Sequence, residues 1–123
     1  ENINKEPIIL HSSQINDMDL IFDIGPNSID DIGKMILESD KIIWNGPPGV
    51  YENENFSNGT KKLVNFIVNS KSKLKVAGGG STVASINHYK ASDYFSHIST
   101  GGGAFLRLLE GKFLKGIEVL KDE

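Results

Sequence analysis

Three glycine-rich turns, each placed directly after a short apolar run, are the residues of this chain best suited to chemistry. The first turn is residues 44–50 (WNGPPGV), the second is residues 78–82 (GGGST) and the third is residues 99–103 (STGGG). Glycine lets a backbone approach a ligand closely, and a helix that begins just afterwards directs its free N–H groups at that ligand. Three such turns at one edge of a parallel sheet predict a site for phosphate groups.

The second turn matches neither of the common nucleotide-binding signatures. No lysine follows its glycines, as a P-loop requires, and Val83 stands where the dinucleotide fingerprint has its third glycine. Taken alone, this turn is better explained as a flexible strand-to-helix connection with Ser81 or Thr82 as the helix cap. The mismatch also argues against a dinucleotide-dependent dehydrogenase.

The first turn and the residues after it are suited to a nucleoside. Pro47 and Val50 supply apolar walls, and the Glu52 carboxylate can accept hydrogen bonds from ribose hydroxyls. The alternative is a tight loop with a solvated glutamate. We expect Trp44 and His97 to lie in the core.

Composition limits how the chain can bind anions. It has 123 residues, a net charge of −3, no cysteine and one arginine, Arg107. This excludes thiolate metal sites and argues against nucleic acid as the partner. Because arginine is the usual bidentate ligand of phosphates, phosphate binding must depend on backbone N–H groups, lysines and a metal ion. No apolar stretch is long enough to cross a bilayer, so we expect a cytoplasmic protein.

Strand and helix patterns alternate along the chain at short spacing. We expect strands at 8–10, 19–22, 41–44, 74–77 and 95–98. We expect helices at about 27–39, 59–69, 82–89 and 102–109, then an extended tail. Such alternation predicts a Rossmann-like α/β fold, a parallel sheet with helices on both faces, in which ligands bind beyond the carboxyl ends of the strands.

Caps and buried faces follow from the same patterns. Asn27 or Ser28 is expected to cap the first helix, and Ser57 or Asn58 the second, while Asp23 anchors its own turn. The residues expected to face the core are Ile29, Ile32, Met35 and Ile36 in the first helix, and Leu63, Phe66 and Ile67 in the second.

Six sequence strings, taken together, resemble the C-terminal, nucleotide-binding half of phosphoglycerate kinases. They are DIGPNSI at 23–29, WNGPPGVYE at 44–52, FSNGT at 56–60, VAGGGST at 76–82, FSHISTGGGA at 95–104 and LLEGKFLKGIEVL at 108–120. Each string is weak by itself, but the six occur in the order and spacing of the family. The resemblance implies that residues 1–123 are the C-terminal part of a doubly wound nucleotide-binding domain, without the substrate domain or the first half of the nucleotide domain.

The resemblance also implies a reaction. The family transfers a phosphoryl group between ATP and 3-phosphoglycerate in glycolysis. The C-terminal domain holds Mg-ATP or Mg-ADP, and an arginine-rich N-terminal domain, absent from this chain, holds 3-phosphoglycerate. A family-like monomer is expected.

Residue roles follow from the same resemblance. The residues implied to line the nucleoside are Asn45, Gly46, Pro47, Val50 and Glu52. Those implied to cradle the phosphates are Gly78, Gly79, Gly80, Ser81 and Thr82. The backbone N–H groups of Gly80 and Gly103, at two helix N-termini, are implied to stabilise the phosphoryl group in flight.

Two positions depart from the family pattern. Ser81 replaces the aspartate that helps to hold the nucleotide's magnesium, and Pro48 replaces a larger apolar residue. A neutral hydroxyl is a weak ligand for Mg²⁺, so we expect weakened handling of Mg-nucleotide with Ser81 as the remaining metal contact. We expect the isolated chain to be inactive. The alternative is a nucleotide-binding module, or a remnant, that has lost catalysis.

Overall fold

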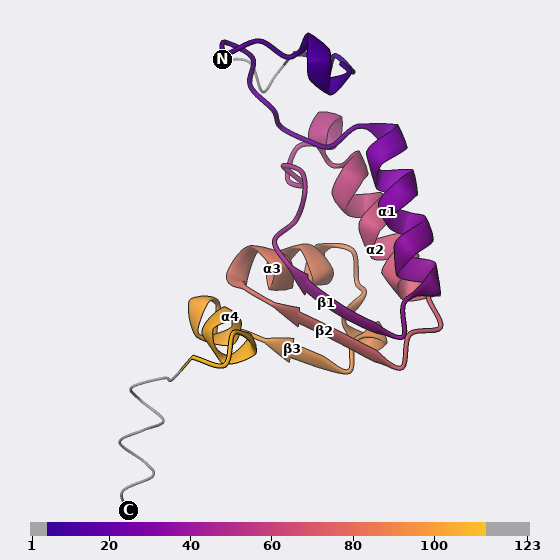
Figure 1. Ribbon diagram of the computed structural model, residues 1–123, viewed down its shortest axis with the longest axis vertical. Helices are drawn as coiled ribbons and strands as arrows, with labels where there is room; N and C mark the ends of the chain where they lie inside the picture. Colours follow the sequence, from indigo (N-terminus) through magenta and orange to yellow (C-terminus); the bar gives the residue numbers. More distant parts are fainter. Residues whose placement is uncertain (1–4, 113–123) are drawn as a thin grey trace, which may run out of the picture.

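Three parallel strands lie at the centre of the fold and end at one edge. The computed structural model describes residues 5–112, and its sheet has the strand order β1-β2-β3 (Figure 1). The strands are β1 (Lys41–Asn45), β2 (Leu74–Gly78) and β3 (His97–Ser99). Asn45 is aligned with Gly78, and Gly78 with Ser99, so the three carboxyl ends are level.

Four α-helices accompany the sheet. They are α1 (Pro26–Glu38), α2 (Asn58–Asn69), α3 (Gly80–His88) and α4 (Gly103–Leu109). Short 3₁₀ helices span Ser12–Gln14, Glu54–Phe56 and Ser92–Tyr94. The expected α/β fold with a parallel sheet is confirmed, and α3 begins two residues earlier than expected because Gly80 and Ser81 already belong to the helix.

The two faces of the sheet are covered unequally. Ile42, Trp44 and Ala77 point to one face and are buried in a core with residues from α1, α2 and α3. On the opposite face Ile43 is 55% exposed. The helix α4 reaches that face at the end of β2, where the Phe105 ring occupies the space that a side chain on Gly78 would need. His97, expected in the core, is exposed because strand alternation turns it toward this less covered face.

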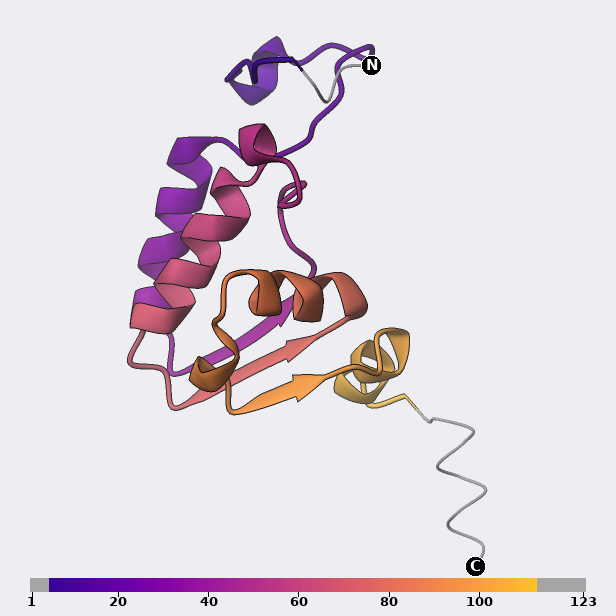
Figure 2. The same cartoon turned by 180° about the vertical axis from the view of Figure 1, so that it is seen from behind.

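Two predicted strands are wrong. Residues 8–10 and 19–22 form no strand, and Ile8 and Ile21 are 81% and 70% exposed. Both views place the segment before α1 beyond the N-terminal end of that helix, away from the sheet (Figures 1 and 2). An apolar run becomes a strand only where another strand is available to pair with it. The predicted tail beyond residue 112 lies outside the described residues.

The helices α1 and α2 pack against each other side by side (Figure 2). Ile29, Gly33 and Ile36 are the buried residues of α1, and Gly33 leaves room for the Phe66 ring of α2. Met35 was expected to face inward but is 61% exposed. A helix turns about 100° per residue, so Met35 lies about 120° around the axis from Ile29.

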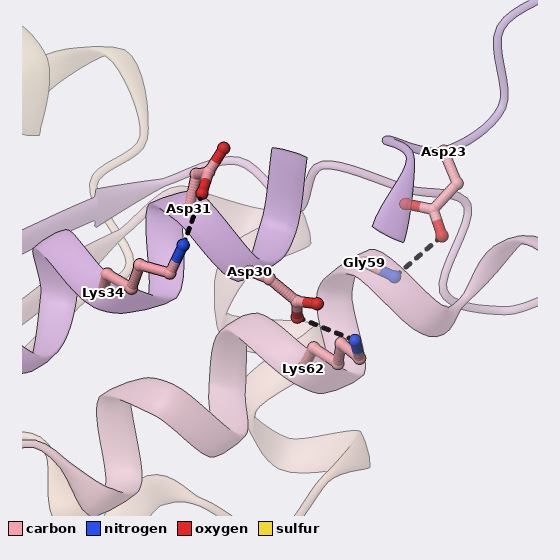
Figure 3. Close-up of polar contacts among 6 residues, drawn as sticks. All are labelled: Asp23, Asp30, Asp31, Lys34, Gly59 and Lys62. Atoms are coloured by element: carbon pink, nitrogen blue, oxygen red, sulfur yellow. Dashed lines mark hydrogen bonds and ion pairs between the residues drawn. The ribbon is translucent and has the colours of Figure 1, made fainter. Parts of the chain in front are cut away.

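A carboxylate from outside the helix caps α2. Asp23 Oδ2 accepts a hydrogen bond from the Gly59 N–H (2.8 Å), as Figure 3 shows. Its other oxygen, Oδ1, accepts one from the Ile24 N–H (2.8 Å). The expected caps are not used: α1 begins after Gly25 and α2 after Ser57, and neither residue makes a side-chain cap bond. Asp23 therefore anchors its own turn, as expected, and the start of α2 as well.

Lys75 is a lysine at a strand position that faces the core, where the other strand residues are apolar. Its side chain is buried, and the ammonium Nζ donates to the Ser70 carbonyl oxygen (2.9 Å) at the C-terminal end of α2. The last carbonyl groups of a helix carry a partial negative charge, which stabilises a cation placed there.

We predict that Asp23→Ala lowers the free energy of unfolding by about 1–2 kcal/mol, because two backbone N–H groups lose their acceptor. Urea unfolding measures the change. The matched control is Asp31→Ala, which removes an exposed ion pair with Lys34 (Figure 3) and should leave stability close to that of the unsubstituted chain. Equal losses in the two variants would contradict the capping role.

Candidate functional site

The three glycine-rich turns lie together at the carboxyl edge of the sheet. Each turn continues from a strand whose end is level with its neighbours, since Asn45, Gly78 and Ser99 are in register. The helix α3 starts directly after β2, and α4 starts a few residues after β3 (Figure 1). The turns are thus neighbours on one rim, in the arrangement in which parallel α/β sheets bind ligands.

The second turn presents the free N-terminus of α3. Gly79 precedes the helix with φ of +96°, a conformation that favours glycine, and no side chain caps this end. The first helical hydrogen bond runs from the Val83 N–H to the Gly79 carbonyl (2.9 Å). The N–H groups at the start of the helix therefore have no acceptor within it, and they carry about half a positive charge.

Open space lies beside the glycines at the helix starts. A Cβ atom added to Gly80 would meet no atom within 4 Å, and the same holds for Gly103. Gly102, with φ of +49°, precedes α4, which is only seven residues long. These backbone positions can be approached by a ligand, whereas Gly78 is buried under Phe105 and serves packing.

The first turn is held by side chains on both sides of Gly46. The Gly46 N–H donates to Thr82 Oγ1 (2.7 Å), and the Gly46 carbonyl accepts from the Trp44 indole Nε1–H (2.8 Å). Asn45 Nδ2 donates to the Gly78 carbonyl (2.9 Å), which ties the first turn to the second. The Asn45 amide group and the Thr82 hydroxyl are therefore engaged within the protein.

The loop that follows the first turn is anchored by α2. Gly49 N–H donates to Thr60 Oγ1 (3.2 Å), and Val50 N–H donates to the Phe22 carbonyl (2.9 Å). Asp23 fills the space beside Gly49, so that this position admits no larger residue. Pro47 and Val50 are half-buried.

An aromatic group borders the same loop. The Tyr51 ring contacts His88 edge-on, and His88 contacts Tyr89. Removal from solvent raises the pKa of the Tyr51 hydroxyl, and its hydrogen bond with Glu52 raises it further. Burial likewise raises the pKa of Tyr89, against the opposing effect of a hydrogen bond with Ser57. The Glu52 side chain is exposed beside this group.

Sequence reasoning missed Thr60 and the role of Thr82 in holding the first turn. Thr60 is fully buried and Thr82 is 1% exposed, and each accepts a hydrogen bond from a glycine N–H of that turn. Thr82 was expected at the site, but as a phosphate contact. The signal that could have found Thr60 is a threonine directly after the glycine that opens a helix, in the string FSNGT.

Residues 5–112 contain no acidic or histidine cluster that could hold a metal ion. No group of three His, Cys, Asp or Glu residues is suitably placed, and Ser81 is exposed and neutral. A cavity of about 440 Å³ lies elsewhere, between the segment before α1 and residues such as Phe56. We place the site at the glycine turns and not in this cavity. The cavity is lined mainly by apolar groups, and no residue of the three turns lines it.

In the described residues, no helix combines the length and the apolar character needed to span a bilayer.

Comparison with known proteins adds the family. The family model described as phosphoglycerate kinase matches residues 2–112. The structure of phosphoglycerate kinase from Coxiella burnetii is 43% identical, with a TM-score of 0.71 over 76% of this chain and 24% of that one. Phosphoglycerate kinase from Pyrococcus horikoshii OT3 is 36% identical, with a TM-score of 0.73 over 83% of this chain and 25% of that one.

The chain thus spans about a quarter of the length of these two solved proteins. The family match, in contrast, extends over all of the residues that the structure describes. On the strength of that match, together with the glycine turns gathered on one rim of a parallel sheet, the chain belongs to the phosphoglycerate kinase family.

Proposed function

We propose that this chain supplies the nucleotide-binding part of an enzyme that transfers a phosphoryl group between ATP and 3-phosphoglycerate, a glycolytic reaction of the cytoplasm. The observation that carries the proposal is the uncapped N-terminus of α3 beside the open space at Gly80, on the same rim as the other two turns. Family membership supports the choice of reaction.

Phosphoryl transfer suits this kind of site. The reaction needs little covalent help from a protein, and catalysis consists mainly of alignment and of stabilising charge on the transferred group. In the proposal, the backbone N–H groups of Gly79, Gly80, Ser81 and Thr82 face the phosphates of ATP or ADP. The Gly80 amide and, across the rim, the Gly103 amide then face the phosphoryl group during transfer.

The nucleoside lies against the first turn in this proposal. Pro47 and Val50 are half-buried and offer apolar contacts, while the exposed Glu52 carboxylate accepts hydrogen bonds from the ribose. Asn45 and Gly46 border the same place from the end of β1.

Magnesium enters as part of the nucleotide substrate. In the second turn, Ser81 is the residue whose side chain would contact the magnesium ion, and its hydroxyl is neutral. Because Mg²⁺ prefers carboxylate and water ligands, this chain is expected to bind ADP with little dependence on magnesium.

The acceptor substrate requires residues that this chain does not supply. Its single arginine, Arg107, cannot form an arginine-rich pocket for 3-phosphoglycerate. We therefore propose that 3-phosphoglycerate binds to a separate domain, as part of a monomeric enzyme, and that the 123-residue chain alone produces no turnover.

A second function is favoured by the same serine. A chain that keeps the phosphate-binding backbone but lacks a carboxylate at position 81 suits a nucleotide-binding module without catalysis. A chimera in which this chain replaces the matching quarter of the Coxiella burnetii protein separates the two functions. Turnover in a coupled assay supports the kinase, and ADP binding without turnover supports the module.

We predict that Gly80→Leu lowers the affinity for ADP at least about tenfold, because the new side chain enters the space reserved for phosphates. Isothermal titration of the 123-residue chain measures it. The control is Gly25→Leu at the start of α1, where a side chain also meets open space. Unchanged ADP affinity in Gly80→Leu would place the phosphates elsewhere.

We predict that Ser81→Asp makes ADP binding depend on magnesium and, in the chimera, raises kcat at least about tenfold, because a carboxylate can ligate the ion. Titrations with Mg-ADP and with metal-free ADP measure the first effect, and the coupled assay measures the second. Ser81→Asn, which is similar in size to aspartate and uncharged, is the control. If Ser81→Asp and Ser81→Asn behaved alike, charge at position 81 would have no part in magnesium binding.

A further inference from the structure

The hydroxyl of Thr82 joins two turns that belong to different strands. Thr82 lies in the first turn of α3, directly after the glycines of the second turn, yet its Oγ1 accepts a hydrogen bond from the Gly46 N–H in the first turn (2.7 Å). Gly46 and Thr82 are 36 residues apart in sequence. This single contact connects the nucleoside side of the proposed site with its phosphate side.

The acceptor of this contact lies in the interior of the protein, although Gly46 itself is exposed. Thr82 is 1% exposed, and its carbonyl accepts from Ser85 Oγ (2.8 Å), which holds the residue within the helix. A buried polar group that loses its hydrogen-bond partner, here the Thr82 hydroxyl, costs more free energy than an ordinary hydrogen bond contributes. The orientation of the Gly46 peptide therefore depends on the position of α3.

Asn45 adds a second hydrogen bond from the first turn to the second. Its Nδ2 donates to the Gly78 carbonyl (2.9 Å), and a Cβ atom on Gly79 would lie 3.2 Å from that nitrogen. The two turns are thus joined by two hydrogen bonds, both donated by adjacent residues of the first turn, Asn45 and Gly46, and accepted at Gly78 and Thr82 of the second. Such a pair restrains rotation as well as separation.

Thr60 provides a contrast within the same loop. It also is buried and accepts from a glycine N–H of the first turn, that of Gly49, but it belongs to α2, and its hydroxyl hydrogen-bonds with Gly49 rather than with the second turn. Loss of the Thr60 hydroxyl would loosen the nucleoside side alone, whereas loss of the Thr82 hydroxyl would remove one of the two hydrogen bonds that hold the two sides together.

We propose that Thr82 is a positioning residue, whose side-chain hydroxyl fixes the nucleoside-binding turn relative to the phosphate-binding turn and meets no part of the ligand itself. The proposal rests on the proposed function, since it assumes a nucleotide across the two turns. Two subsites held at the right separation bind one connected ligand more tightly than the separate parts, because the protein does not have to order them on binding. The gain should appear for ADP and not for its fragments.

The experiment compares three ligands by isothermal titration with the 123-residue chain: ADP, adenosine and inorganic pyrophosphate. Thr82→Val is expected to lower the ADP affinity about tenfold and to change the adenosine and pyrophosphate affinities less than about twofold. Thr82→Ser, which keeps the hydroxyl, is expected to retain the ADP affinity. Thr60→Val is expected to lower the ADP and adenosine affinities by the same factor.

Circular dichroism checks that each variant is folded, and Thr82→Ala, which removes the same oxygen with less crowding, replaces Thr82→Val if the latter does not fold. ADP affinity that is unchanged without the hydroxyl overturns the proposal, and so do equal losses for ADP and its fragments. No ADP binding by the unsubstituted chain overturns the proposed function and this inference with it. ADP binding that Thr82→Val leaves intact overturns this inference alone.

Discussion

Every backbone group that this protein can offer to a ligand depends on the level ends of three parallel strands. Because Asn45, Gly78 and Ser99 are aligned, the chain leaves the sheet three times at the same height. Each exit needs a tight change of direction, and glycine at Gly46, Gly79 and Gly102 supplies the positive φ angles. A shift of one strand by two residues would move one turn by about 7 Å and open the rim.

The rim is rigid because the helices hold it from behind. Buried polar groups from α2 and α3 accept the backbone N–H groups of the first turn, and Asp23 connects the start of α2 to the chain before α1. The space beside the Cα atoms of Gly80 and Gly103, in contrast, is open. The protein thus satisfies the inner side of its turns with its own side chains and leaves the outer side to whatever binds there. Under the proposed function, this division lets backbone N–H groups take the place of arginine in holding phosphates.

The sequence predicted what depends on local pattern and missed what depends on distant contacts. The glycines after apolar runs indicated the turns, and the period of apolar residues in α1 and α2 indicated the helices. Residues 8–10 look like a strand locally, yet no strand lies beside them. The partner of Thr82 is 36 residues away, as is the N–H that Asp23 caps, and no spacing rule links such pairs. The positions of the candidate residues on one rim could be predicted, but their hydrogen-bond partners could not.

The buried ammonium of Lys75 has a consequence for how the chain can misfold. A slip of β2 by one residue would turn Ala77 away from the core, whereas a slip by two residues would keep the same face inward, so the apolar pattern alone penalises the second slip less. A slipped Lys75 would lose the Ser70 carbonyl, the acceptor that its buried Nζ has in this register. Lys75 in the middle strand therefore disfavours slipped strand registers that apolar side chains alone would tolerate. It thereby helps to keep the ends of the three strands level.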